Sequence, residues 1–236
     1  MPREFQVESF ISGKELNNQS VSLVIPRITR DRIHNNIYYK CNLHTVSLRG
    51  DSMNHLTKII IRDFGKIKDP YVKELNGSML VGGPQFKCLL MKLIEIRPTM
   101  EQLQAMFELG CTIPNFEDKY IIALLLVYGR IQYYYLNIDS EIAKYWRNSL
   151  KKYITDYRKV KVINMHEDCW SQSQNIGVSI AHLDEIVDRL AIKEEIWGIP
   201  LGKCQWGDIY NEEIDDESSE DSDSEEESYS DTNSSS

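Results

Sequence analysis

The chain has 236 residues, 42% of them hydrophobic, with 36 acidic and 27 basic side chains that give a net charge of −9. Its five cysteines are odd in number, widely spread and without a CxxC pair, which excludes the disulfide framework of a small secreted domain and indicates free thiols in a reducing compartment. We expect no secretory signal, because no apolar run follows Met1, and no membrane span, because Arg130 and Gln132 interrupt the apolar window 120–138.

The first part of the chain predicts an irregular arm over residues 1–22, followed by two helices. Thr29 is a candidate N-cap for a helix that runs to about Cys41. Asp51 or Ser52 is a candidate N-cap for the second. The apolar face of that second helix is formed by Met53, Leu56, Ile59, Ile60 and Phe64.

Two further helices follow a glycine-rich break. Residues 82–84 read Gly-Gly-Pro, which places Pro in the favourable first turn of a helix that Pro98 ends. Thr99 and Gln102 form a capping box for the next helix, and Gly110 suits its C-terminal cap. The first of these helices carries an apolar stripe of Phe86, Leu89, Leu90, Leu93 and Ile94.

The remaining helices surround a strongly apolar one. Residues 119–136 are apolar on nearly every side in their first half, which is typical of the central helix of a bundle. Asp139 or Ser140 is expected to cap a helix to about Tyr157, and Ser179 one to about Ile192.

These patterns predict an all-α protein with a single multi-helix domain of about seven helices over residues 23–206. Residues 196–206 form an extended apolar C-terminal arm, in which Gly198, Pro200 and Gly202 prevent a helix. Its two tryptophans, Trp197 and Trp206, either dock on the chain's own body or anchor a partner.

Residues 207–236 are predicted to be a disordered acidic tail. The segment 212–236 holds twelve acidic residues, nine serines and no Lys or Arg, and removing it leaves a body of 24 acidic and 27 basic residues, or +3. Four of its serines precede an acidic residue by three positions, a pattern typical of acidophilic-kinase substrates: Ser218, Ser222, Ser224 and Ser228.

A basic face is predicted on the helix that begins at Ser140. Lys144, Arg147, Lys151 and Arg158 fall within about 60° of one another at 100° per residue. This face could meet a phosphate backbone, an acidic partner helix or the chain's own tail, or it could simply be solvated. The separate apolar face of the same helix holds Ile142, Trp146, Leu150, Tyr153 and Tyr157.

Several side-chain combinations have a chemical and a structural interpretation, and we favour the structural one for each. His182, Asp184, Glu185 and Asp188 could serve acid–base or metal chemistry but suit a solvated helix face. Two more sets are weaker still: Cys41-x-x-His44 with His166-x-x-Cys169 has zinc-like spacing, and Gly50-Asp51-Ser52-Met53 resembles an esterase block but fits a helix cap. Gly82-Gly83 with Lys87 lacks the P-loop pattern and is interpreted as a turn. Since each combination has a simpler structural interpretation, we assign no catalytic residue, metal or cofactor.

The chain as a whole resembles the fungal pre-mRNA-splicing factor 38 family over about residues 4–206. The runs that carry the resemblance are 17–27, 29–31, 33–35, 38–40, 82–83, 86–88, 91–98, 119–128, 132–136 and 196–206. Animal members carry an Arg/Ser-rich extension where this chain has an acidic tail, so contacts of such extensions are not transferred.

The resemblance implies a nuclear, non-catalytic helical scaffold of the spliceosomal tri-snRNP that acts when the spliceosome is activated and U4 RNA is released. It implies two protein partners, a small zinc-finger protein and a helical microfibril-associated-type protein, with spliceosomal RNA as a possible indirect partner and no membrane or small-molecule substrate. The residues alone indicate only a helical interaction module. A direct RNA-binding protein and a metal-dependent hydrolase built on His182, Asp184 and Glu185 are the alternatives.

Overall fold

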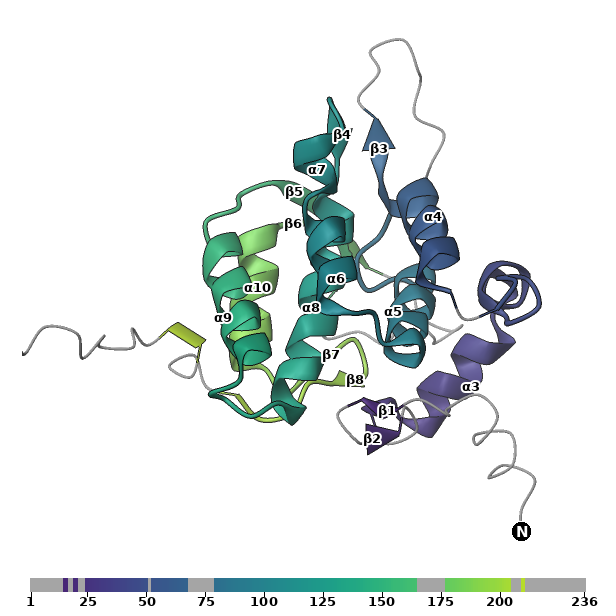
Figure 1. The fold of residues 1–236 in the computed structure, drawn as a ribbon, viewed down its shortest axis with the longest axis horizontal. Helices are drawn as coiled ribbons and strands as arrows, with labels where there is room; N and C mark the ends of the chain where they lie inside the picture. Colours follow the sequence, from purple (N-terminus) through teal and green to yellow (C-terminus); the bar gives the residue numbers. More distant parts are fainter. Residues whose placement is uncertain are drawn as a thin grey trace, which may run out of the picture.

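The computed structural model describes residues 15–16, 19–20, 24–50, 52–67, 79–164, 177–204 and 209–210. It is mostly helical, as predicted, with small two-stranded sheets that the sequence reading did not include (Figure 1). Except for Ile209 and Tyr210, the predicted acidic tail lies outside these residues, as do Ser218, Ser222, Ser224 and Ser228 and most of the predicted N-terminal arm. None of the described helices is long and apolar enough to cross a membrane.

The described helices are interleaved with short strands of two to five residues. The N-terminal part contains the hairpin β1 (Glu15–Leu16) and β2 (Gln19–Ser20), α3 (Arg27–Asn35), the π-helix η1 (Tyr39–Leu43), α4 (Met53–Phe64), β3 (Lys66–Ile67), α5 (Pro84–Ile96), α6 (Met100–Phe107), α7 (Leu109–Thr112) and β4 (Phe116–Glu117). The C-terminal part contains α8 (Lys119–Tyr135), α9 (Glu141–Tyr153), β5 (Lys159–Ile163), β6 (Val178–His182), α10 (Leu183–Ile192), β7 (Glu195–Ile196) and β8 (Ile199–Pro200).

Helix α8 is the centre of the fold, as its sequence predicts. Every residue from Tyr120 to Ile131 is buried, because α4, α5, α6, α9 and α10 all pack around it. Helix α5 is also buried along most of its length, and its first turn begins at Pro84 as expected. The capping box of Thr99 and Gln102 is present at the start of α6.

Three predicted helix ends are wrong in the N-terminal half. Helix α3 begins after Pro26, so Thr29 is a buried residue inside it rather than its cap. The helix ends at Asn35, and Cys41 lies in the separate π-helix. Gly110 lies inside the short helix α7, where a Cβ would collide with the carboxylate of Asp118.

Two further corrections concern the C-terminal half. Helix α9 ends at Tyr153, four residues before the predicted end, and Tyr157 is exposed. Ser179 is not a helix cap but part of strand β6, which pairs antiparallel with β5 in the register Lys159 to His182. Lysines alternate with β-branched residues in β5, which is a strand pattern, so Lys159 and Lys161 do not lie on the helix that carries Lys144, Arg147 and Lys151.

The buried guanidinium of Arg130 joins α8 to the C-terminal arm. Its Nε donates to the carbonyl of Leu190 at 2.8 Å, Nη1 to that of Leu201 at 2.7 Å and Nη2 to that of Gly202 at 2.9 Å. Leu190 lies in the last turn of α10, where carbonyls lack partners within the helix. The Arg130 side chain thus provides a hydrogen-bond donor for a carbonyl at the end of α10 and fixes the position of the arm.

We expect Arg130→Lys to lower the free energy of unfolding by about 2–4 kcal/mol, because an ammonium cannot replace the planar fork and leaves buried carbonyls unpaired. Urea denaturation of the full chain measures this loss. Lys193→Met, at an exposed position just after α10, is the control and should change stability by less than about 0.5 kcal/mol. Equal stability of Arg130→Lys and the wild type would show that the three bonds are dispensable.

Candidate partner-binding groove

Helix α9 presents part of the predicted basic face to solvent. The Ser140 side chain accepts a hydrogen bond from the Ala143 N–H at 3.2 Å and caps the helix. Lys144, Arg147 and Lys151 are partly exposed, and Lys144 forms an ion pair with Glu141 at 3.6 Å. The opposite face of the helix packs against α8 and α10 through Ala143, Trp146, Leu150 and Tyr153.

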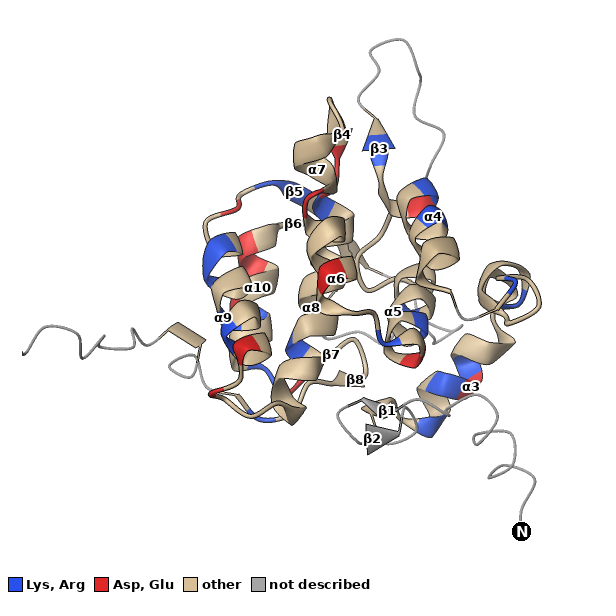
Figure 2. Ribbon diagram, in the orientation of Figure 1, with Lys and Arg blue, Asp and Glu red and all other residues tan. Residues whose placement is uncertain are grey.

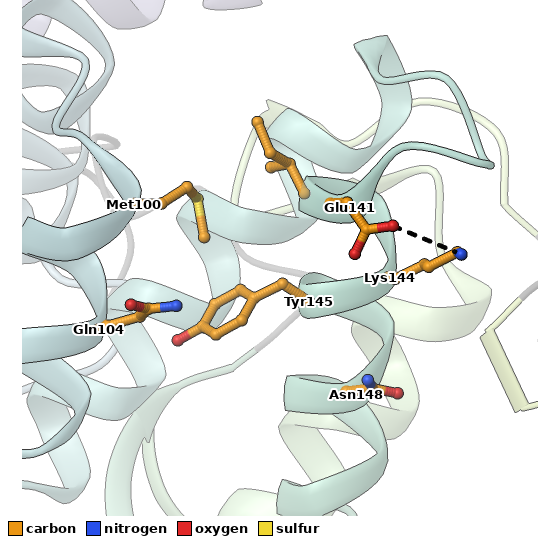
Figure 3. A pocket seen from close by; sticks show the side chains of 7 residues that line it. Met100, Gln104, Glu141, Lys144, Tyr145 and Asn148 are labelled. Atoms are coloured by element: carbon orange, nitrogen blue, oxygen red, sulfur yellow. Dashed lines mark ion pairs between the residues drawn. The ribbon is translucent and has the colours of Figure 1, made fainter.

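Beside this face lies a hollow between α6 and α9 with a volume of about 460 Å³ (Figure 3). Its walls are formed by Met100 and Gln104 from α6 and by Glu141, Ile142, Lys144, Tyr145 and Asn148 from α9. A second hollow of about 490 Å³ is lined by Ile96, Arg97, Pro98, Thr99, Met100, Gln132, Leu136 and Ile142. Because the two hollows share Met100 and Ile142, they form one continuous surface, which we name the α6–α9 groove.

An aromatic cluster holds α6 and α9 together beneath the groove. The ring of Phe107, at the end of α6, stacks on Tyr153 with a centroid distance of 5.8 Å and meets Trp146 edge-on at 6.2 Å. Tyr145 meets Trp146 edge-on at 5.5 Å, and burial raises the pKa of the Tyr145 hydroxyl. These contacts set the spacing of the two helices that form the walls.

Arg158 does not belong to the basic face of α9. Its Nη1 lies 2.6 Å from Oδ1 of Asp118, the residue before α8, and its Nη2 lies 2.7 Å from Oδ2 of Asp156. Burial alone would lower the pKa of the Arg158 guanidinium, but its hydrogen bonds to Asp156 and Asp118 raise that pKa above its usual value. Arg158 therefore lies outside the basic face predicted for α9, and its side chain ties the start of α8 to the turn before β5.

Trp197 belongs to the chain's own core. It is 2% exposed, meets Phe86 edge-on at 5.6 Å and donates a hydrogen bond from Nε1 to the Ile163 carbonyl at 3.3 Å. The arm therefore docks on the body at this point, and the interpretation of Trp197 as an anchor for a partner is corrected. Trp206 lies outside the described residues.

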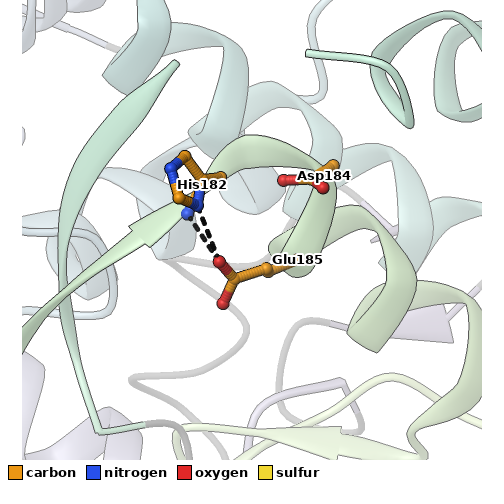
Figure 4. Close-up of side chains that lie close together, drawn as sticks. All are labelled: His182, Asp184 and Glu185. Carbon is orange, nitrogen blue, oxygen red and sulfur yellow. Dashed lines mark hydrogen bonds and ion pairs between the residues drawn. The ribbon is translucent and has the colours of Figure 1, made fainter. Parts of the chain in front are cut away.

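The acidic cluster at the start of α10 is a helix cap. The ligand atoms of His182, Asp184 and Glu185 lie within 4.8 Å of one another. Glu185 Oε1 accepts a bond from the His182 backbone N–H at 3.3 Å and lies 2.8 Å from its Nδ1, whereas Asp184 lies apart from this pair (Figure 4). The hydrogen bond to His182 lowers the pKa of Glu185, as expected for a capping box.

The esterase-like block and the Gly-Gly turn lie at the starts of helices, whereas the zinc-like pairs are only partly described. Ser52 occupies the predicted N-cap position of α4, but its side chain accepts no capping hydrogen bond. Gly82–Gly83 form the turn before α5. Cys41 is exposed on η1, while His166 and Cys169 lie outside the described residues, so the zinc-like pairing is not placed.

The groove was not predicted from the sequence, because the walls of the groove come from two different helices. Ile142 was assigned to the apolar face of α9 with Trp146 and Leu150, yet it is 37% exposed and lines the groove. The spacing of Met100 and Gln104 on α6, and of Ile142 and Tyr145 on α9, marks one side of each helix. Only the packing of α6 beside α9 brings these two sides together.

Comparison with known proteins shows the family of the chain. The family model described as PRP38 matches residues 14–213. The chain belongs to the PRP38 family. It is 53% identical over 227 residues to Pre-mRNA-splicing factor 38 of Saccharomyces cerevisiae, covering 92% of this chain and 90% of that protein.

More distant members also match this PRP38-family chain. Pre-mRNA-splicing factor 38 of Schizosaccharomyces pombe is 27% identical over 192 residues, covering 80% of this chain and 72% of that protein. Pre-mRNA-splicing factor 38A of Xenopus tropicalis is 24% identical over 182 residues, which is 77% of this chain and 47% of the frog protein.

The fold is shared with a solved structure of low sequence identity. A chain in the crystal structure of the Snu23–Prp38–MFAP1 complex of Chaetomium thermophilum matches with a TM-score of 0.52 and 19% identity, covering 78% of each chain. At this identity the likeness concerns the fold alone.

We expect Arg158→Met to lower the free energy of unfolding by about 1–2 kcal/mol at pH 7, a range that allows for solvent screening of the partly exposed guanidinium. Burial alone would raise the pKa of Asp156, but the bonds from Arg158 hold it below its usual range. The stability that this ion pair contributes is present above the unfolded pKa of Asp156, about 4, and is lost as the pH falls through its folded pKa. The deficit of the variant, measured by urea denaturation, should therefore shrink below about pH 4.

Arg158→Lys is the matched control, because it keeps the charge and loses the planar fork, and its deficit should be intermediate. A deficit that is independent of pH would contradict the role assigned to these carboxylates.

The capping interpretation predicts that His182→Ala lowers stability by about 0.5–1 kcal/mol and does not change the metal content of the purified chain. Thermal denaturation and elemental analysis measure the two effects. Stoichiometric zinc in the wild type that disappears in His182→Ala would instead support a metal site at this cluster.

Proposed function

We propose that this chain is a non-catalytic protein scaffold of the spliceosomal tri-snRNP that is needed for spliceosome activation and U4 RNA release in the nucleus. The observation that carries the proposal is the 53% identity with a pre-mRNA-splicing factor over 90% of that factor's length. An identity this high over the whole body supports the same molecular role for both proteins. Its tri-snRNP assignment and its place at activation rest on the family resemblance.

The α6–α9 groove is the surface that suits a helical partner. Its lining combines the apolar side chains of Met100 and Ile142 with polar and charged groups such as Gln104 and Lys144. An amphipathic helix docks in such a groove by placing its apolar face on the floor. We assign this role to a microfibril-associated-type helical protein, and we propose a zinc-finger protein as the second partner. Both assignments are supported by the crystal structure of the Snu23–Prp38–MFAP1 complex, which contains a chain of the same fold.

The basic side chains of α9 define the charge of the partner. Lys144 lines the groove, and Arg147 and Lys151 follow at one and two turns along the same helix (Figure 2). An acidic partner helix, or RNA carried by the complex, would be attracted to this row. The mechanism is positional: the scaffold holds its partners in place while a separate helicase acts.

Native affinity purification of the tagged full chain from nuclear extract tests this function. We expect tri-snRNP proteins and their small RNAs to co-purify. Recovery of the chain alone at low salt would contradict the scaffold role. Direct RNA binding, the alternative, would give micromolar or tighter affinity of the purified chain for RNA that falls steeply with salt.

The variant Lys144→Glu, Arg147→Glu, Lys151→Glu should reduce co-purification of the complex by about tenfold or more, because it reverses the charge that faces the partner. Circular dichroism should show an unchanged fold, since all three side chains lie on the partly exposed face of α9. Unchanged co-purification would remove α9 from the interface.

The matched control reverses three exposed basic residues on the other side of α8: Lys40→Glu, Arg49→Glu and Lys58→Glu. Equal losses in the two variants would show that net charge, rather than the α9 surface, controls assembly.

A further inference from the structure

Arg97, at the end of α5, has a strained backbone. Its φ of 53° and ψ of 72° lie in the left-handed region, and its N–H donates to the Leu93 carbonyl at 2.9 Å, which closes the helix. Glycine is the usual residue at this position of a helix end, because a Cβ is unfavourable there. Pro98 follows directly and favours an extended conformation at residue 97, which adds to the cost. The chain therefore carries an arginine where a glycine would be more stable.

The side chain of Arg97 lines the second hollow of the α6–α9 groove, where it is half-buried. The other described residues that line this hollow are uncharged, and most of them are apolar. A guanidinium beside apolar surface loses part of its hydration. This loss is offset only when a carboxylate or several hydrogen-bond acceptors face the charge.

The described part of the chain supplies no such partner for Arg97. Its side chain forms no ion pair and no hydrogen bond with a described residue. The acidic residues next to it in sequence lie elsewhere: Glu95 is buried with its Oε2 2.9 Å from Nζ of Lys92, and Glu101 is exposed on the first turn of α6. Neither the strain nor the lost hydration of Arg97 is therefore offset by these contacts.

The cation in the first hollow differs in this respect. Lys144 forms an ion pair with Glu141 at 3.6 Å, so its charge is partly neutralised before a partner arrives (Figure 3). The charge of Arg97 is not neutralised in this way. Within the groove, Arg97 is consequently the stronger attractor of a negative group.

The position of Arg97 relative to α6 indicates which negative group fits. Arg97 lies three residues before Met100, the first residue of α6, and both hollows are lined by Met100 and Ile142. A helix that docks along α6 advances about 5–6 Å over three or four residues. It can therefore place an acidic side chain at Arg97 and an apolar side chain, one turn away, over Met100 and Ile142. An RNA phosphate would leave this apolar surface uncovered.

We propose that Arg97 is a specificity-determining residue of the α6–α9 groove and pairs with a carboxylate of the partner helix, one turn from the apolar residue that covers Met100 and Ile142. The inference rests on the proposed function, in which a microfibril-associated-type helical protein occupies the groove. The strain at Arg97 is a cost to the free chain that holds the guanidinium in place for the partner. Helices without an acidic residue at this spacing bind more weakly, because they bury the guanidinium unpaired.

Replacement of Arg97 by glycine separates binding from stability. Arg97→Gly removes both the guanidinium and the strain, so the Tm of the full chain should rise by about 2–4 °C. The affinity for the purified microfibril-associated-type protein of the same organism, measured by isothermal titration calorimetry, should fall about tenfold or more. A lower Tm of Arg97→Gly would show that Arg97 has a structural role and would overturn the proposal.

Arg49→Gly is the matched control. Arg49 also has a positive φ, 56°, and it is exposed and does not line either hollow. Its replacement by glycine should raise the Tm similarly and leave the affinity unchanged. Equal losses of affinity in the two variants would show that only net charge matters, which is incompatible with a specific pair at Arg97.

A double-mutant cycle identifies the carboxylate. Each acidic residue of the partner that lies three or four positions from an apolar residue is changed to its amide, and binding to the wild type and to Arg97→Gln is measured. One of these changes should weaken binding to the wild type about tenfold and binding to Arg97→Gln hardly at all.

Two kinds of failure can be distinguished in these experiments. Additive losses for every acidic residue, or an unchanged affinity of Arg97→Gly, would overturn the pairing and leave the partner assignment intact. Failure of the wild-type chain to bind the microfibril-associated-type protein would contradict the proposed partner itself, and the pairing with it.

Discussion

The three hydrogen bonds of Arg130 are the constraint on which the C-terminal half of the fold depends. A guanidinium buried in the central helix is costly unless acceptors surround it, and here the acceptors are carbonyls of α10 and of the arm. Neither segment can move without breaking hydrogen bonds of this buried charge. The arm is consequently part of the core, although its two glycines and its proline make it irregular.

The arm in turn orders parts of the chain that lie far from α8. Its hairpin turn has positive φ at Trp197 (52°) and Gly198 (75°), and the Trp197 ring occupies the space that a Cβ of Gly82 would need. The same ring packs on Phe86 in α5 and bonds to the end of β5. A substitution at Gly82 would therefore disturb the arm, the start of α5 and the β5–β6 pair together.

The sequence predicted the elements whose local signals and tertiary packing agree. Helices α5, α6 and α8 have a break, a cap or a continuous apolar run at the expected place. Strand β6 was assigned to a helix because Ser179 is a good cap, whereas pairing with β5 determines its conformation. The groove and the role of Arg158 depend on contacts between distant segments, for which a single sequence holds no local signal.

The α6–α9 groove is better suited to holding a partner than to adapting to one. Its walls are fixed from beneath by the rings of Phe107, Tyr145, Trp146 and Tyr153, and α9 is packed against both α8 and α10. A rigid surface loses little conformational entropy on binding, so even a groove with a small apolar floor can bind a helix usefully. Specificity must then come from the few charges at the rim, which is why reversing the α9 row should weaken binding without changing the fold.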